Sequence, residues 1–316
     1  MKKNVRFLLC FISLVKLTEC SGCPESVKYA VQTVTEDYTY ETKHFDTKVI
    51  SPSEDTFSIT LESDVPILCK GMLNITKPTH HFYGSSSGIK EIEPGTFENQ
   101  NIDSQLLLPY NSLTVIRRGT FRNMIITQLD LTYNKITTIE KGALQHLPLL
   151  SILNLGRNRI KEFHPNSIVS TPKLLFFDMS LNKLEKLEEN HFSFMSKERN
   201  VGIGLAENKL REIHPKAFKG IDVFTLNLTG NHLSAIPKEV FANNKLSYLA
   251  IAYNDLTHLD QEFFDMNTTI LRDVQLEGNH FNKKTLKKLK PFMKIIEENR
   301  RQDQRYHQFD DTVHYR

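Results

Sequence analysis

Apolar residues recur along the chain in short alternating runs, each followed by a single asparagine. In the segment LDLTYNKITTI, Leu129 and Leu131 alternate with polar residues, Asn134 follows, and Ile136 and Ile139 come next. Alternation places Leu129 and Leu131 on the same face of a strand, toward a core. The segment therefore predicts a short strand that ends in a turn at Asn134.

The same arrangement occurs eight times, at spacings of 23 to 26 residues. Its asparagines are Asn111, Asn134, Asn158, Asn182, Asn208, Asn231, Asn254 and Asn279. Apolar residues stand three and five positions before each asparagine, and a second apolar column, which includes Phe121 and Leu144, stands ten positions after. A further copy begins at Phe82 and has Ser87 in place of the asparagine. A fixed period of this length predicts a solenoid of nine stacked repeats.

Stacking also explains the asparagines. One repeat cannot bury its apolar face alone, whereas parallel strands about 4.8 Å apart form one continuous core. The turn after each strand would bury backbone N–H and C=O groups that lack partners in the sheet. An asparagine amide has two donors and an acceptor, so a ladder of asparagines can satisfy successive turns. We interpret all eight asparagines as structural.

The motif LxLxxNxLxxI, with a phenylalanine ten residues after the asparagine, resembles the extracellular leucine-rich repeat of about 24 residues. The resemblance implies an α/β solenoid, a horseshoe with about nine parallel strands on its concave face, a β cap at the N-terminus and a helical cap at the C-terminus. The chain also looks like secreted arthropod leucine-rich repeat proteins, including those of innate immunity. The cysteines of the usual C-terminal cap are absent. The expected segments are a signal peptide (1–20), an acidic segment with the cap (21–81), repeats (82–281), the helical cap (282–300) and a polar tail (301–316).

The two ends of the solenoid need covers, because terminal strands expose core and unpaired backbone. At the front, FSITLE and VPILCKGML are expected to form two short strands, and part of the polar region 27–56 is expected to be mobile. At the back, Pro291 is expected to start a second short helix. The predicted buried stripe there is Leu286, Leu289, Phe292 and Ile296. An amphipathic membrane helix is the alternative for this segment.

The first twenty residues combine a basic head with a short apolar run, which is typical of a secretory signal peptide. A signal anchor is the alternative, although the run is short for a membrane span. The end of the sequence lacks the hydrophobic tail of a lipid-anchor signal. Cys10 and Cys20 belong to the leader, which leaves Cys23 and Cys69 to form one disulfide in an oxidising compartment. Free or metal-bound cysteines are the weaker reading. We expect a secreted, extracellular protein with no membrane insertion.

The formal net charge of +3 lies entirely within the leader, so the mature chain is near neutral. Residues 283–316 hold ten Lys and Arg against five Asp and Glu, a surplus of five, and the rest of the mature chain has the matching deficit. This distribution argues against nucleic acid as a partner of the repeats. The basic end either meets an anionic surface or is a solvated helix face.

The sequence contains no pattern that indicates catalysis. His80 and His81 precede the first repeat, and His164 and His214 share one offset two repeats apart, with no cysteine or carboxylate cluster at metal-ligand spacing. We therefore predict no enzyme activity, no catalytic residues, no cofactor and no metal.

Recognition through the concave face is the function that a solenoid favours. Candidate ligand-binding residues at outward positions of the strands are Gln105, Tyr110, Gln128, Asp130, Tyr133, Arg157, Asp178, Glu207, Tyr248, Tyr253, Asp273, Gln275 and Glu277. Tyr110, Tyr133 and Arg157 share one offset in three successive repeats, so we expect them to form a line. Tyr and Arg are enriched at binding hot spots, although a chance row of exposed residues remains the alternative.

Three N-x-[ST] motifs predict glycosylation, at Asn74, Asn227 and Asn267. Asn227 is an outward strand residue, so a glycan there would shield the neighbourhood of Tyr248 and Tyr253 and favour the N-terminal half for contact with a ligand. Hindrance by the strand, which would leave Asn227 unmodified, is the alternative. The sequence thus predicts a secreted binding protein for an extracellular protein or glycan, with a matrix or cell-adhesion component as the alternative. The oligomeric state and the identity of the ligand do not follow from it.

Overall fold

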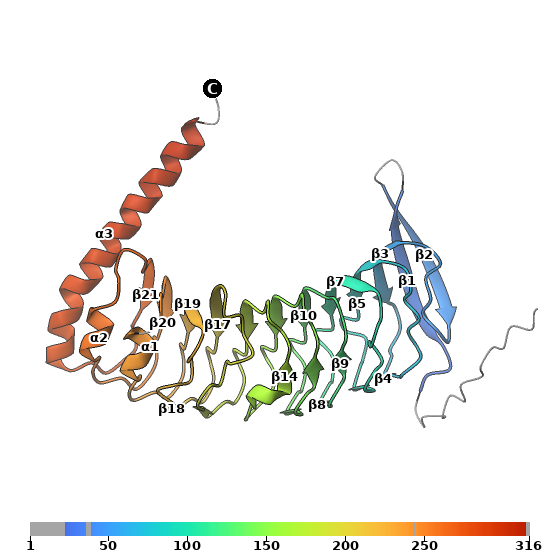
Figure 1. Ribbon diagram of the computed structural model, residues 1–316, viewed down its shortest axis with the longest axis horizontal. Coiled ribbons are helices and arrows are strands. Elements are labelled where there is room, and N and C mark those ends of the chain that lie inside the picture. The colour runs from blue at the N-terminus through green and yellow to red at the C-terminus, as the bar shows by residue number, and fades with distance from the viewer. Residues whose placement is uncertain (1–22, 36–38, 243, 314–316) are drawn as a thin grey trace, which may run out of the picture.

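A computed structural model describes residues 23–35, 39–242 and 244–313, with side chains through Arg301. The expected signal peptide, Cys10 and Cys20 lie outside the described residues. Parallel strands follow one another along one face of the solenoid (Figure 1). Their bounds are β3 (Thr56–Leu61), β5 (Thr79–Tyr83), β7 (Ile102–Leu107), β10 (Gln128–Asp130), β13 (Ile152–Asn154), β15 (Phe176–Asp178), β17 (Asn200–Gly204), β19 (Asp222–Asn227), β20 (Tyr248–Ala250) and β21 (Asp273–Gln275). The prediction of a leucine-rich repeat solenoid is confirmed.

Shorter strands run along the opposite side of the coils, where they form small parallel sheets. Their bounds are β4 (Ile67–Leu68), β6 (Glu91–Ile92), β8 (Val115–Ile116), β9 (Phe121–Arg122), β11 (Thr138–Ile139), β12 (Leu144–Gln145), β14 (Ile168–Val169), β16 (Lys186–Leu187) and β18 (Glu212–Ile213). The 3-10 turn η1 (Pro165–Ser167) precedes β14.

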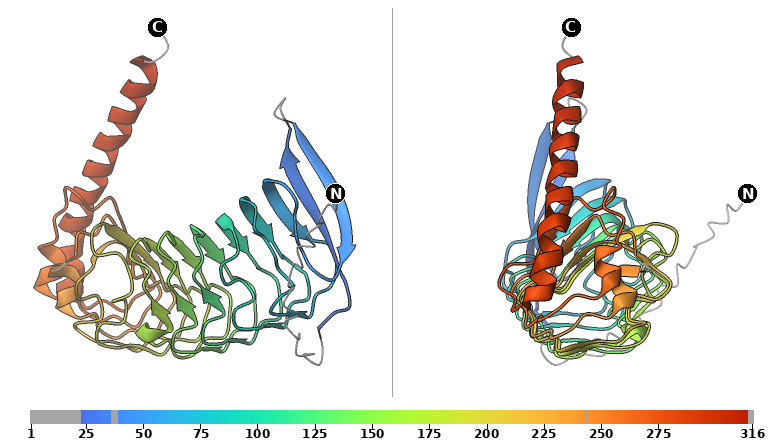
Figure 2. Two further views of the ribbon diagram at one scale, coloured as in Figure 1. Left: turned by 45° about the vertical axis from the view of Figure 1, so that its right-hand side comes forward. Right: turned by 90° about the vertical axis from the view of Figure 1, so that its left-hand side faces the viewer.

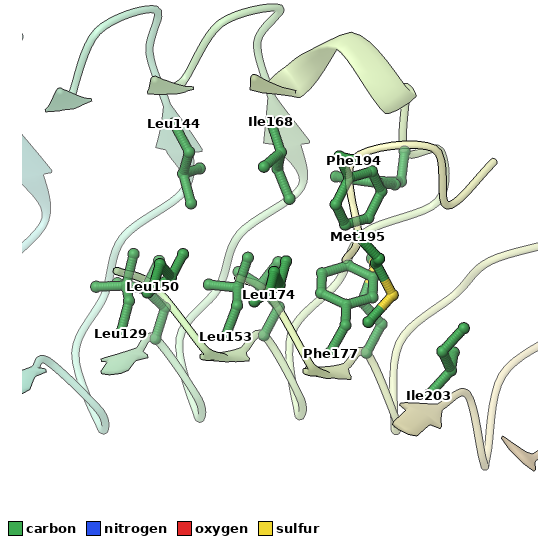
Figure 3. Packing of buried hydrophobic residues seen from close by; sticks show 14 of the residues in the cluster. Leu129, Leu144, Leu150, Leu153, Ile168, Leu174, Phe177, Phe194, Met195 and Ile203 are labelled. Carbon is green, nitrogen blue, oxygen red and sulfur yellow. The ribbon is translucent and has the colours of Figure 1, made fainter. Parts of the chain in front are cut away.

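The core lies between these two sets of strands. Leu129 pairs in register with Leu106 and Leu153, and all three side chains are fully buried. From the opposite side, Leu144 and its register partner Ile168 point into the same space (Figure 3). Each coil therefore buries its apolar face only by stacking on the next, as the period predicts.

The repeat asparagines form the expected ladder. Asn134 Nδ2 donates to the carbonyls of Leu108 in the preceding coil (3.0 Å) and of Leu131 in its own coil (3.1 Å). Its Oδ1 accepts the N–H of Leu113, 3.1 Å away. The other repeats show the same bonds, from Asn111 to Asn279. Each asparagine thus links the turns of two adjacent coils.

The N-terminal end differs from the prediction in two ways. The strand of FSITLE, β3, pairs in parallel with β5, and Ile59 aligns with Phe82, so this segment forms an additional coil of the solenoid. The cap is instead an antiparallel hairpin, β1 (Val27–Val34) and β2 (Tyr40–Thr47), within the region 27–56. Alternate side chains of β1, including Val27 and Tyr29, are buried, and β2 is exposed throughout. Every residue of β2 is exposed, although the ring of Phe45 stacks on that of Tyr29, so its sequence shows no apolar alternation.

A disulfide joins the start of the described chain to this first coil. Cys23 and Cys69 are bonded, as predicted, with their Cα atoms 6.1 Å apart. The bond closes a loop across a sequence separation of 46 residues, and that loop contains the whole hairpin.

The C-terminal end is covered by helices. The short helices α1 (Lys238–Ala242) and α2 (Gln261–Phe264) lie in the last coils, and α3 (Lys283–Val313) packs against α2. The predicted helix break is wrong, because Pro291 lies inside α3, which also extends well past residue 300. Pro291 and Lys287, whose carbonyl loses its helical donor, are both exposed, so water can satisfy that carbonyl.

Side chains on both sides of Pro291 anchor α3. Leu289, Phe292 and Ile296 are buried, and the ring of Phe292 lies 5.0 Å from that of Phe263 in α2. Leu286 was predicted to be buried with them, which is wrong, because 52% of it is exposed.

In Figures 1 and 2, α3 and the β1–β2 hairpin rise from opposite ends of the solenoid, on the side of the long sheet. Among the described residues, no helix has the length and hydropathy needed to cross a membrane.

Candidate functional site

The outward side chains of the long sheet form a grid, because the strands pair in register. One column contains Gln105, Gln128, Ile152, Phe176, Gly202, Thr225, Tyr248 and Asp273. A second column contains Leu107, Asp130, Asn154, Asp178, Gly204, Asn227, Ala250 and Gln275. This grid is the concave face of the solenoid. A ligand can contact it without disturbing the core, which lies on the other side of the sheet.

Tyr110, Tyr133 and Arg157 lie together at the edge of this face. They were expected to be strand residues, and that expectation is wrong. Each occupies the turn after its strand, with a φ angle of 58°, 54° and 57°, respectively. The turns stack: Tyr110 N–H donates to the carbonyl of Thr132, and Tyr133 N–H to that of Gly156. The left-handed conformation is uncommon for such residues, so stacking fixes where these three side chains leave the backbone.

These three side chains contact one another in the predicted line. The rings of Tyr110 and Tyr133 stack with centroids 4.2 Å apart and planes 18° from parallel. The Arg157 guanidinium lies 4.7 Å from the centroid of the Tyr133 ring, within cation–π range. We call this group the Tyr–Tyr–Arg stack. It presents two phenol hydroxyls and a guanidinium on a preordered apolar surface.

Hydrogen bonding within the stack affects its titration. The pKa of Tyr110 is raised above its usual value, mainly by a side-chain hydrogen bond with Tyr133 and secondly by desolvation. Tyr110 is nevertheless 56% exposed. Both hydrogen-bonding capacity and apolar surface are therefore available to a partner at neutral pH.

Several other predicted site residues have structural partners. Gln105 Nε2 donates to Gln128 Oε1 at 2.8 Å. Asp130 Oδ1 accepts the N–H of Thr132, and Asp178 Oδ1 accepts both the N–H and the hydroxyl of Ser180. These carboxylates therefore close the turn after their own strand, which occupies one of their oxygens.

The C-terminal part of the face is acidic and lined by small residues. Glu207 leans over Gly230 and Tyr253 leans over Gly278, in each case where a Cβ would collide with the side chain. Burial, followed by the nearby carboxylates of Asp273 and Glu277, raises the pKa of Tyr248.

Sequence reasoning missed two features of this surface. Phe176 lies in the outward column with 55% of its surface exposed, and its ring covers Gly202. It was overlooked beside the core residue Phe177, although alternation alone would have placed it outward. The second feature is a row of exposed cations directly after the ladder asparagines, namely Lys135, Arg159, Lys183 and Lys209. Their backbones stack in register, so the offset alone could have revealed the row.

Several histidines have hydrogen-bond partners within the fold. His164 Nδ1 and His214 Nδ1 each accept the N–H of the residue two positions on, at the same turn of different repeats. His80 contacts Asp103 at 2.8 Å. Within the described ranges, the one group close enough to hold a metal is Cys23, Cys69 and Glu93, and there the thiols are joined as a disulfide.

The three predicted glycosylation sites are accessible in different ways. Asn74 and Asn267 are exposed in loops. Asn227 lies in β19 in the second column, between Gly204 and Ala250. Its Oδ1 accepts the N–H of Thr229 at 3.1 Å. Both neighbours are small, and the carboxylate of Asp178 lies over Gly204.

Stacked parallel coils, an asparagine ladder and a variable concave face together define a leucine-rich repeat protein. The leucine-rich repeat family model matches residues 104–160 and 223–281, and the observed solenoid has the leucine-rich repeat fold. It is 30% identical to keratocan of Gallus gallus over 181 residues, which are 55% of this chain and 49% of keratocan. It is 29% identical to Tsukushi of Xenopus tropicalis over 119 residues, which are 37% of this chain and 33% of Tsukushi. Both relatives are extracellular proteins.

Solved structures share the fold. The Toll–Spatzle complex of Drosophila superposes with a TM-score of 0.57 at 20% identity, over 64% of this chain and 28% of that chain. The mouse RP105/MD-1 complex gives a TM-score of 0.56 at 16% identity, over 72% of this chain and 43% of that chain. The chain spans about half the length of keratocan and less of Tsukushi.

Proposed function

We propose that the protein is a secreted, non-enzymatic binding protein that recognises an extracellular protein or glycan through its concave face. The observation that carries the proposal is the Tyr–Tyr–Arg stack, in which three exposed side chains from successive coils are already held together. A partner that binds them pays little conformational entropy to immobilise these side chains, because they already contact one another. Aromatic and Arg side chains are also the residue types that contribute most to binding energy at interfaces.

The contact surface proposed is the N-terminal half of the face. It contains the stack, the linked amides of Gln105 and Gln128, and, toward the centre, the exposed ring of Phe176. A glycan on Asn227 would cover the C-terminal half, around Tyr248 and Tyr253. Ligand contact is therefore assigned to the coils of β7 to β15.

Solved neighbours support a protein as the ligand. The Toll–Spatzle and RP105/MD-1 structures are both complexes, and the Toll–Spatzle complex is described as a molecular hub in Drosophila development and innate immunity. We extend a protein partner, and a role in innate immunity, to this chain as part of the proposal.

The test is affinity capture from extracellular fluid with two immobilised proteins, the wild type and a Tyr110→Ala, Tyr133→Ala, Arg157→Ala variant. A variant with Ile125→Ala, Leu149→Ala and Val169→Ala is the matched control, because these exposed side chains lie outside the long sheet. We expect a partner captured by the wild type and the control and lost from the stack variant. Equal capture by all three would refute the proposed site.

The second candidate is a matrix or adhesion component, which the relationship to keratocan favours. Salt-extractable retention in tissue would support it, whereas a freely circulating protein induced by infection would support the first candidate. Deleting residues 283–316 is unsuitable as a test, because it would uncover the rings of Phe263 and Phe264. Substitution of exposed lysines leaves the cap in place.

A further inference from the structure

The first three turns of α3 carry an unusual concentration of positive charge. Residues 283–294, KKTLKKLKPFMK, contain six lysines and no Asp or Glu. The helix begins at Lys283, after Asn282, whose Oδ1 accepts the N–H of Thr285. The segment is thus a fixed basic surface at the C-terminal end of the solenoid.

Helical geometry separates these lysines from the packed side of α3. Successive residues are about 100° apart, so the spacings of four, three and four residues place four lysines within an arc of about 60°. They are Lys283, Lys287, Lys290 and Lys294, and all are exposed. The buried side chains Leu289, Phe292 and Ile296 lie on the opposite side. We call the four residues the lysine stripe. It spans about 16 Å along the helix. It faces away from the solenoid, because the buried side of α3 is opposite. Figure 2 shows α3 at one end of the solenoid.

The protein itself does little to neutralise this charge. Within the described part of the chain, Lys294 contacts Glu298 at 3.8 Å, and no carboxylate lies within ion-pair distance of Lys283, Lys287 or Lys290. Lys288, on another side, donates to Gln261 and lies over the ring of Phe264.

The position of the charge is unfavourable for the helix. The N-terminus of a helix carries partial positive charge, so cations in the first turns are repelled by it. Lysines three or four residues apart, such as Lys283 with Lys287 and Lys290 with Lys294, also repel one another. Helix stability alone would favour acidic residues here, and the first turn has none. An anionic partner would relieve both repulsions.

We propose that the lysine stripe is a second interaction surface, separate from the concave face, that binds a linear sulfated polysaccharide. A row of exposed cations on a rigid rod matches a chain with regularly spaced anionic groups. Binding is electrostatic, so it weakens as salt screens the charges.

The geometry disfavours an anionic membrane as the partner. A helix that lies on a membrane inserts an apolar face, and the apolar face of α3 already packs on Phe263 and Phe264. The exposed apolar residues Leu286 and Ile295 lie on opposite flanks of the lysine stripe, about 180° apart. They cannot insert together.

The test measures the affinity of the full secreted chain for a heparin octasaccharide at 0.15 M NaCl, with elution from a heparin column as a second readout. The test variant is Lys283→Gln, Lys287→Gln, Lys290→Gln, Lys294→Gln. The matched control is Lys141→Gln, Lys173→Gln, Lys197→Gln, Lys219→Gln, which removes the same charge from exposed positions elsewhere. A Lys287→Gln, Lys290→Gln variant covers the case in which four substitutions impair folding.

We expect the stripe variant to bind heparin at least tenfold more weakly than the wild type, the control to stay within twofold, and the double variant to lie between. Because repulsion is removed, the stripe variant should melt at the wild-type temperature or higher. If the control variant lost as much affinity for heparin as the stripe variant, net charge alone would explain the loss, and the proposal would be overturned. Binding to phosphatidylserine vesicles without binding to heparin, or no wild-type binding to heparin, would overturn it as well.

Discussion

Replacing Asn134 with Leu tests the asparagine ladder at a single rung. Asn134 is 6% exposed, and its amide bonds to backbone groups of two coils. After the change, the carbonyl of Leu108 keeps its bond from Asn111, and the carbonyl of Leu131 keeps its bond from Asn158. The buried N–H of Leu113 loses the side-chain oxygen that it bonds.

The magnitude follows from this inventory. The Leu113 N–H, a buried donor left without an acceptor, costs about 1 to 3 kcal/mol. Loss of the bonds from Asn134 Nδ2 costs only about 1 kcal/mol more, because the carbonyls of Leu108 and Leu131 keep other donors. We therefore expect the free energy of unfolding to fall by about 2 to 4 kcal/mol. Urea denaturation followed by far-ultraviolet circular dichroism measures it, and the absence of tryptophan rules out the usual fluorescence probe.

The matched control is Asn154→Leu, the same substitution at an outward position of β13, where the corresponding residue of β7 is Leu107. It should change stability by less than about 0.5 kcal/mol, as is usual for surface changes. Asn134→Asp keeps the acceptor for Leu113 but faces two carbonyls with a carboxylate, so it should be least stable at neutral pH and recover as the carboxyl is protonated. If Asn134→Leu unfolds at the same urea concentration as the control, the ladder does not stabilise the turns.

Three further predictions concern other parts of the chain. Burial lowers the pKa of His191 from 6.5 to about 4, so the unfolded chain takes up a proton at a higher pH than the folded chain. The free energy of unfolding should therefore fall by up to about 3 kcal/mol as pH drops from 6.5 to 4. In pH-dependent denaturation, the His191→Asn variant should not show this fall. Replacing Cys23 and Cys69 with Ser should lower the free energy of unfolding by about 4 kcal/mol from loop entropy, measured against the wild type with and without reductant. Asn227 should carry a glycan, which mass spectrometry of the glycosidase-treated peptide from secreted protein would detect; an unmodified Asn227 beside occupied Asn74 and Asn267 would remove the reason to exclude the C-terminal half of the face.

The repeats were predictable because their sequence pattern and their burial have the same cause. Leu129 and its counterparts face the core in every coil, so the period alone identifies strands and register. Ser87 could be placed even without the asparagine, because Phe82 and Ile89 on either side of it keep the register, and its N–H does bond to Asn111 in the next coil.

The ends were harder to predict because tertiary contacts decide them. The strand β2 is exposed along its whole length and forms only by pairing with β1, so its own sequence gives no apolar signal. Pro291 is a local signal for a helix break, but packing of Phe292 and Ile296 on the last coil outweighs it. Within the candidate site, the shared offset predicted that Tyr110, Tyr133 and Arg157 would meet. The left-handed turn that holds them depends on the stacked coils and is not encoded in the residue types.

The most direct test of the central claim is the affinity of a captured partner for the protein in which Tyr110, Tyr133 and Arg157 are replaced by Ala. Surface plasmon resonance at matched salt, on variants with native circular dichroism spectra, gives the dissociation constants. Recognition through the Tyr–Tyr–Arg stack predicts binding at least 100-fold weaker than the wild type, with the Ile125, Leu149, Val169 control within twofold. Wild-type affinity in the stack variant would contradict the account.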